Sequence, residues 1–241
     1  MSSPVPLLND KHANLKVIST GDYTRYKENH LISIVTQDFF TLTAEFPLVF
    51  VKGNEANEFI PVAIMGLREG QNLYCQTEKW IGQVIPLSFG SAPFSIARTS
   101  PESEEFAVLI EEDSPLVSDT EGEALFTESG ERTEYLERRV ESMTQLAQHI
   151  LHTKAVCKLL ADNKLFSTQR LQLKHRPDAK TYNIDGVYTV NEEALNGLPD
   201  EDFLKLRTSG LLPMIYAHLS SLQQLRRISQ MQYEADKAAE E

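Results

Sequence analysis

The sequence predicts an α+β fold in which a long amphipathic helix and C-terminal helices pack on an antiparallel β-sheet. Short runs rich in β-branched and aromatic residues, separated by polar turns, fill the first half of the chain. One long stripe of apolar residues at helical spacing begins after Thr133. A β-hairpin pattern and further amphipathic segments follow that stripe. We therefore expect strands first, then one dominant helix, then mixed structure.

The first half of the chain should form a meander of antiparallel strands joined by short loops. Residues 1–14, which contain two prolines, are expected to be an exposed lead-in. Asp38 is expected to cap a short helix that carries Phe39, Leu42 and Phe46 on one face. The predicted strands cover residues 15–18, 30–36, 48–51, 59–67, 73–75, 93–98 and 106–110.

The long helix has a clear start signal. Thr133 is a suitable N-cap residue, and Glu134 and Glu137 place negative charge in the first turn, where the helix dipole favours it. The apolar stripe then continues at spacings of three and four, interrupted by Lys154, which predicts one helix that reaches at least residue 160. The stripe consists of Leu136, Val140, Met143, Ala147, Ile150, Cys157 and Ala161.

A β-hairpin should follow the long helix. Residues 165–175 and 182–190 have strand character, and the polar sequence R-P-D-A-K lies between them. Asn191 is expected to cap a short helix that Gly197 ends, and a second short helix should end at Gly210. The sequence thus predicts two short helices after the hairpin.

One further helix should complete the fold. It is predicted to begin near Pro213, a residue suited to a first helical turn, and to run through Ile228. We expect residues 15–232 to form a single α+β domain and residues 233–241 to form a flexible acidic tail.

Bulk composition excludes several classes of function. The chain has 241 residues and a formal net charge of -12, which argues against nucleic acid or an anionic membrane as a partner. No apolar run is long enough to span a membrane, and the N-terminus lacks a signal-peptide pattern. Cys75 and Cys157 could form a disulfide, but the lack of a signal-peptide pattern favours buried free thiols in a reducing compartment, so a cytoplasmic location is expected. Homo-oligomerisation stays open.

No catalytic residue is predicted from motifs. The sequence contains no G-x-S-x-G, no phosphate-binding loop and no G-x-G-x-x-G. His149 and His152 lie three residues apart on the predicted long helix, but a closed metal site needs three or four ligands. No cofactor is indicated, so the cofactor remains unknown.

The acidic loop is the candidate metal site. Carboxylate oxygens suit hard cations, and Glu111, Asp113 and Asp119 are the candidate ligands. An EF-hand does not fit, because Ala124 and Gly130 occupy the positions that require glycine and glutamate. A solvated loop is the alternative interpretation. The full acidic set that could converge is Glu111, Glu112, Asp113, Asp119, Glu121 and Glu123.

A ligand pocket is the second candidate site. Tyr74 and Trp80 belong to an aromatic-rich stretch that could be either sheet core or a ligand-binding surface. His218 lies close to the apolar face of the last predicted helix, where it could be a hydrogen-bonded core residue or a ligand. The predicted ligand-binding residues are Tyr74, Trp80, Arg98 and His218.

Six motifs in order resemble the SapC family of bacterial proteins. They are F-P-L-V-F-V-K, F-I-P-V-A-I-M-G-L, P-F-S-I-A-R, I-E-E-D-S-P-L-V-S-D-T-E-G-E-A-L-F, Y-L-E-R-R-V-E and Y-A-H-L-S-S-L-Q-Q-L. The resemblance covers about residues 15–225, nearly the whole chain. The ordered set is specific, whereas no single motif would be.

The resemblance implies a non-enzymatic accessory or interaction protein linked to the bacterial surface layer. Relatives tend to be encoded near flavin-dependent halogenases, 2-oxoglutarate oxygenases and outer-membrane receptors. This implies an alternative, a protein that binds a small molecule, a modified amino acid or a peptide beside such an enzyme. A metal-dependent enzyme that uses the acidic loop ranks last, and the resemblance transfers no catalytic residue. The partner is thus expected to be an unknown protein or a small molecule.

Overall fold

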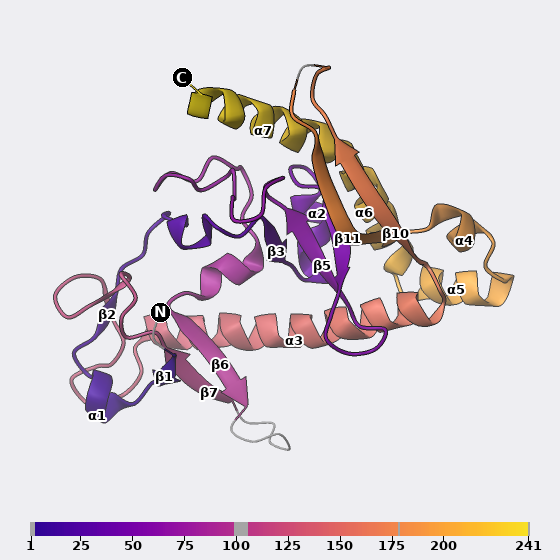
Figure 1. The fold of residues 1–241 in the computed structure, drawn as a ribbon. Helices are drawn as coiled ribbons and strands as arrows, with labels where there is room; N and C mark the ends of the chain where they lie inside the picture. Colours follow the sequence, from indigo (N-terminus) through magenta and orange to yellow (C-terminus); the bar gives the residue numbers. More distant parts are fainter. Residues whose placement is uncertain (1–2, 99–105, 178, 241) are drawn as a thin grey trace. The chain divides into compact units, whose positions relative to one another are not determined.

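The computed structural model describes residues 3–98, 106–177 and 179–240. The chain is α+β, with antiparallel sheets and a long helix, as the sequence predicts (Figure 1). It divides into two compact units. The single domain expected for residues 15–232 stays a prediction. The first unit comprises residues 1–21 and 87–148, and the second comprises residues 22–86 and 149–241.

The first unit contains two small antiparallel sheets with the orders β1-β7-β6 and β8-β2-β9. Its apolar core gathers side chains from both sheets and from the start of α3. The strands are β1 (Val5–Pro6), β2 (Lys16–Val17), β6 (Phe94–Arg98), β7 (Phe106–Ile110), β8 (Val117–Ser118) and β9 (Glu123–Ala124). The helical segments are α1 (Asn9–His12), η3 (Leu87–Ser91) and the N-terminal half of α3 (Glu134–Asp162).

Most of residues 3–14 are exposed, but part of this N-terminal segment pairs with and packs against the first unit. Val5 and Pro6 pair with β7, and the Leu7 N–H donates to the Val108 carbonyl at 2.8 Å. His12 is only 1% exposed. The apolar side chains of Val5 and Leu7 pack against the core, and proline is compatible with an edge strand. Burial of these side chains therefore holds the segment in place.

The acidic loop turns back on itself around β2. β8 and β9 pair with opposite sides of β2, so the short segment between them must cross from one side of β2 to the other. Gly122 lies in this turn with φ +109°, a backbone conformation that favours glycine. A Cβ at this position would come within 2.5 Å of the Val17 carbonyl oxygen. The turn therefore requires glycine for two independent reasons.

The second unit is built on a five-stranded antiparallel sheet with the order β10-β11-β4-β5-β3. The predicted pair 48–51 and 59–67 and the predicted hairpin are confirmed. The strands are β3 (Leu31–Ser33), β4 (Leu48–Lys52), β5 (Phe59–Ile64), β10 (Phe166–Leu173) and β11 (Tyr182–Val190). The helices and 3₁₀ turns are η1 (Thr24–Tyr26), η2 (Thr36–Asp38), α2 (Phe39–Leu42), the C-terminal half of α3, α4 (Glu192–Asn196), α5 (Asp200–Thr208), α6 (Leu211–Ser221), η4 (Leu222–Gln224) and α7 (Leu225–Glu240).

Aromatic packing dominates the core of the second unit. The Phe50 ring lies 4.7 Å from the Phe166 ring, and Phe59 lies 4.3 Å from Phe166. Phe39 and Phe46 are fully buried. Because large aromatic side chains bury much apolar area, this cluster ties β4, β5 and β10 into one sheet.

The predicted caps of α3 and α4 are confirmed. The Thr133 hydroxyl accepts the Leu136 N–H at 3.3 Å at the start of α3, which is 29 residues long. The Asn191 side chain accepts the Ala194 N–H at 3.1 Å at the start of α4. Each side chain satisfies a helix-end N–H group that would otherwise lack a partner.

Two predicted elements differ in the structure. Residues 73–75 form a turn rather than a strand, and the Leu73 N–H donates to the Met65 carbonyl at 2.8 Å. The predicted last helix is divided into α6 and α7 by the 3₁₀ turn η4. At this point the Ser221 hydroxyl donates to the His218 carbonyl at 2.6 Å, a local side-chain bond that competes with regular helix. α7 continues to Glu240, so residues 233–240 are helical.

Asp38 takes a different role from the cap expected of it. Its carboxylate accepts the Val35 N–H at 3.2 Å and closes the 3₁₀ turn η2, and it makes no side-chain cap to α2. The predicted apolar face is confirmed, because Phe39, Leu42 and Phe46 are all 0% exposed. The Asp38 carboxylate thus stabilises the 3₁₀ turn that precedes α2 and does not cap α2 itself.

Candidate functional site

Glu112 of the acidic loop contacts Lys11 and His12 of its own unit. The Glu112 carboxylate lies 2.7 Å from Lys11 Nζ and 2.9 Å from His12 Nε2. These two contacts, that of Lys11 first, lower the pKa of Glu112. Asp113 and Asp119 are exposed. Within the residues that the structure describes, no three His, Cys, Asp or Glu side chains are placed to hold a metal ion. The convergence required of a metal site at Glu111, Asp113 and Asp119 is therefore not met there.

Two of the four predicted ligand-binding residues lie beside each other. Tyr74 is 1% exposed, its ring lies 5.6 Å from the Trp80 ring, and its hydroxyl donates to the Glu45 carbonyl at 3.5 Å. Burial raises the pKa of the Tyr74 hydroxyl. Arg98 ends β6, and its side chain lies outside the described part of the structure. Tyr74 and Trp80 thus belong to an aromatic cluster that also includes Phe46.

His218, the fourth residue, is a core histidine. It is 0% exposed on α6, and the Val190 N–H donates to its Nε2 atom at 3.1 Å. Burial lowers the pKa of His218 to about 4, an effect that the backbone of Leu48 partly offsets. The imidazole is therefore neutral near pH 7, and Nδ1 carries its proton because Nε2 accepts. This arrangement joins α6 to β11 and presents no group to a ligand.

A buried carboxylate that the sequence analysis did not single out lies in the same unit. Glu45 is 3% exposed, and its Oε1 atom lies 2.8 Å from the Arg227 guanidinium. Its Oε2 atom accepts the N–H groups of Gln83 at 2.8 Å and Val84 at 3.2 Å. Both oxygens are thus engaged, as expected for a buried charge in a structural role. The Glu45–Arg227 ion pair joins α7 to the segment between α2 and β4.

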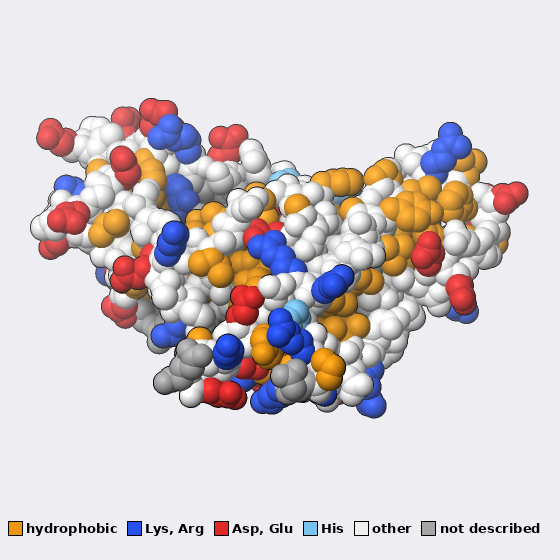
Figure 2. All heavy atoms as spheres, turned by 90° about the horizontal axis from the view of Figure 1, so that it is seen from above, with side chains coloured by type: hydrophobic (Ala, Val, Ile, Leu, Met, Phe, Trp, Pro, Cys, Tyr) orange, Lys and Arg blue, Asp and Glu red, His pale blue; other side chains and the backbone are white. Residues whose placement is uncertain are grey.

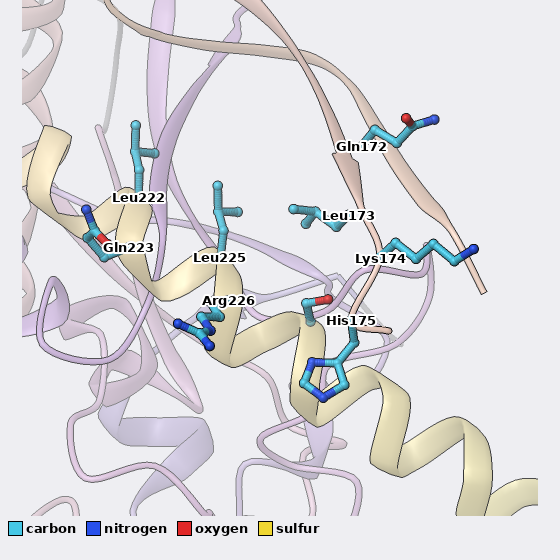
Figure 3. Close-up of a pocket in the computed structure, with 9 residues that line it drawn as sticks. Gln172, Leu173, Lys174, His175, Leu222, Gln223, Leu225 and Arg226 are labelled. Atoms are coloured by element: carbon cyan, nitrogen blue, oxygen red, sulfur yellow. The ribbon is translucent and has the colours of Figure 1, made fainter. Parts of the chain in front are cut away.

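A groove in the second unit is the strongest candidate for a binding site. It has a volume of about 550 Å³ and lies between the end of β10 and the start of α7 (Figure 3). Leu173 points toward Leu225, and with Leu222 these side chains form an apolar floor. The lining residues are Gln172, Leu173, Lys174, His175, Leu222, Gln223, Leu225, Arg226 and Ser229. The groove thus combines an apolar surface with nitrogen-bearing side chains.

The rim of the groove is basic in an acidic protein. Lys174, His175 and Arg226 line it, and no Asp or Glu does so among the described residues. Two further cations lie close in sequence: Arg176 stacks over the Tyr233 ring at 5.4 Å, and Lys180 lies 5.3 Å from the Tyr182 ring. Figure 2 shows one face of the molecule, on which Lys and Arg side chains lie beside apolar ones, with Asp and Glu side chains among them. With a formal net charge of -12 for the chain, this local excess of positive charge favours an anionic ligand.

A second pocket of about 320 Å³ lacks this charge excess. Its lining includes Glu55, Glu58, Lys154 and Lys158. Lys154 Nζ lies 2.8 Å from Glu58, and Lys158 Nζ lies 2.8 Å from Asp162. Both lysines have carboxylate partners in the chain itself, so this pocket has less unpaired positive charge for an anionic ligand than the groove has.

The sequence analysis missed the groove because its two walls are far apart in the chain. One wall comes from residues 172–175 and the other from residues 222–229. A signal was present, since the segments R-L-Q-L-K-H-R and L-R-R-I are rich in cations within an acidic chain. That signal identifies basic segments, but only the fold brings them to one surface.

The fold and the groove define an α+β protein with a basic groove in its second unit. No described helix combines the length and apolar character needed to cross a bilayer. The SapC family model matches residues 7–228, and the chain therefore belongs to the SapC family. Searches of curated proteins and of solved structures found no match. Family membership confirms the resemblance carried by the six motifs.

Proposed function

We propose that this SapC-family protein is a non-enzymatic accessory protein that acts by binding an anionic partner in the groove beside α7. The single observation that carries the proposal is the apolar floor with a basic rim and no described lining carboxylate. The family resemblance supplies the setting, an accessory role linked to the bacterial surface layer. The buried free thiols Cys75 and Cys157 agree with action in a reducing compartment.

The groups with strongly shifted pKa values lie outside both pockets. Such groups mark catalytic sites when they line a cleft, but here Tyr74, His218 and Cys157 are buried in the core and line neither pocket. Burial raises the pKa of Cys75 to about 11 and that of Cys157 to about 12, so neither thiol is activated.

Within the groove, the described residues form no nucleophile–base pair. His175 and Ser229 both line it, but no hydrogen bond joins them. The His175 ring packs against Tyr233 at 5.3 Å, and no described carboxylate in the lining orients it. The arrangement therefore lacks the oriented base that nucleophilic catalysis uses.

A small-molecule ligand is the second candidate. The groove volume of about 550 Å³ falls within the usual range of small-molecule sites, roughly 300–1,000 Å³. A carboxylate with an apolar body, such as an amino acid derivative or a 2-oxo acid, would match the floor and rim. A protein that binds such a carboxylate fits the alternative role, in which it acts beside an oxidative enzyme.

A thermal-shift screen against amino acids, 2-oxoglutarate, short acidic peptides and divalent metals tests the proposal. A ligand that binds the native state raises the melting temperature by mass action. We expect a hit that is lost in Arg226→Glu and retained in Lys237→Glu, a matched charge reversal on the same helix outside the groove lining. A hit that shifts both variants equally would place binding elsewhere. Turnover of any screened compound would contradict the non-enzymatic role.

A further inference from the structure

We propose that the groove receives an acidic, extended segment of a partner protein, which adds to the sheet as a strand along β10. This inference rests on the proposed binding function and names the chemistry of the partner. It follows from the position of β10 at the edge of the sheet, the position of the groove at the end of that strand, and the charge around the groove.

β10 is an edge strand. Among the strands in the described residues, this eight-residue strand pairs only with β11, at one end of the five-stranded sheet. An edge strand presents a row of backbone N–H and C=O groups toward its open side. Such a row can bind another extended chain through main-chain hydrogen bonds, with side-chain pockets providing selectivity.

The groove lies at the C-terminal end of β10. Gln172 and Leu173, the last two residues of the strand, line it, and Lys174 and His175 follow directly in the chain. Successive side chains of a strand point to opposite sides, so Leu173 and its two neighbours are expected on opposite sides of the chain. Figure 3 agrees, since Leu173 points toward α7 while Gln172 and Lys174 point away from it.

The helix side of this edge offers a place for an apolar side chain. Leu222 and Leu225 face Leu173 across the groove (Figure 3). A strand laid along β10 would direct every second side chain toward these leucines and the others toward the side of Lys174. The structure therefore suits a segment that alternates apolar and polar residues.

The positive charge of the groove rim indicates that the polar residues of the partner segment are acidic. Lys174, His175 and Arg226 surround the edge, and Lys174 and Arg226 have no ion-pair partner among the described residues. The charges thus favour an Asp- or Glu-rich segment of another protein.

The first test is fluorescence anisotropy with two labelled heptapeptides, one alternating Glu and Val and the other alternating Lys and Val. We expect the acidic peptide to bind and the basic one not to bind. Arg226→Glu should weaken binding by about tenfold or more, whereas Lys237→Glu should not change it. Binding of both peptides, or equal loss in the two variants, would overturn the inference.

The second test asks whether binding uses the peptide backbone. Along a strand, N–H groups point alternately toward one neighbour and away from it, so only one alternate set can pair with β10. N-methylation of one set should abolish binding, and N-methylation of the other set should leave it intact. Equal effects of both sets would exclude strand addition.

The two proposals fail in different ways. If a small molecule gives a thermal shift that Arg226→Glu removes but the acidic peptide does not bind, the groove binds ligands and strand addition is wrong. If neither binds, both proposals fall. If the protein instead self-associates and Arg226→Glu changes its oligomeric state, the groove takes a second copy, and the partner proposed here is wrong.

Discussion

Acidification should destabilise the protein through one buried imidazole, that of His218. Burial lowers the pKa of His218 from its ordinary value of 6.5 to about 4 in the folded state. Between these two values the unfolded chain binds a proton that the folded chain does not, so folding stability must decrease as the pH falls. The stabilising contribution is therefore complete above pH 6.5 and is lost as the pH approaches 4.

The expected loss of unfolding free energy follows from the pKa shift of His218. Each pKa unit corresponds to about 1.4 kcal/mol, so going from neutral pH to about pH 4.5 should remove about 2.5 kcal/mol of unfolding free energy. Protonation would place charge beside the Phe50 ring, 5.0 Å away, and would remove the acceptor of the Val190 N–H. The effect is large against the usual stability of a domain, roughly 5–15 kcal/mol.

Urea unfolding at several pH values between 7.5 and 4.5 measures this effect, with His218→Gln as the decisive variant. Glutamine does not titrate, and its side-chain oxygen can accept the Val190 N–H. We expect the variant to be less stable at neutral pH but to lose about 2.5 kcal/mol less than the wild type on acidification. His152→Gln, at an exposed position on α3, is the matched control and should behave as the wild type.

Other groups also lower the unfolding free energy as the pH falls, but their contributions cancel when the variants are compared with the wild type. The lowered pKa values of Glu58 and Glu112 also cost stability as the pH falls, and they do so equally in all three proteins. Parallel curves for the wild type and His218→Gln would show that His218 already binds its proton in the folded state. The acceptor role assigned to Nε2 would then be incorrect.

Three further predictions concern a buried hydrogen bond, a helix cap and the thiols. Thr153→Val should cost about 1–3 kcal/mol in urea unfolding, because the hydroxyl accepts the buried Thr36 N–H at 2.9 Å, and Thr153→Ser should retain most of that stability. Asn191→Ala should cost about 1 kcal/mol in the same assay through loss of the α4 cap, with Asn191→Asp close to wild type. Cys75 and Cys157 are buried. An aromatic disulfide reagent should therefore label neither thiol in the folded protein at mildly alkaline pH, and should label both in urea. Rapid labelling of the folded protein would contradict their burial.

Local sequence signals predicted the helix starts and the strand pairs well. Thr133 and Asn191 act within one helical turn, so the residues needed to recognise a cap are adjacent in the chain. The strand pair of β4 and β5 and the hairpin of β10 and β11 are likewise joined by short connections. Sequence predicts such elements because few alternatives compete with them.

Non-local pairing was the part that sequence could not provide. β1 pairs with a strand about a hundred residues away, since Val5 lies opposite Ile110, and nothing near Val5 indicates that partner. The break between α6 and α7 depends on Ser221, whose hydroxyl also accepts the Leu48 N–H at 3.0 Å from another element. A periodic apolar pattern continues across such a break without change.

The candidate sites show the same limit. Tyr74 and His218 were chosen for their chemistry, and burial placed both in the core, where that chemistry serves packing. The groove depends on Leu173 and Arg226, ordinary residues that acquire a role only when β10 and α7 meet. Residue type predicts what a side chain can do, whereas its neighbours in space decide what it does.

The glycine in the acidic loop has a consequence for mutational tolerance. In a saturation library, position 122 should accept no other residue, while the neighbouring exposed carboxylates Asp119 and Glu121 should accept many. The acidic segment would then show a profile opposite to that of a ligand site, with the backbone-determining residue invariant and the charged ones replaceable. Deep mutational scanning of this loop would thus identify Gly122 as the residue that the turn requires. The sequence alone would instead draw attention to the carboxylates around it.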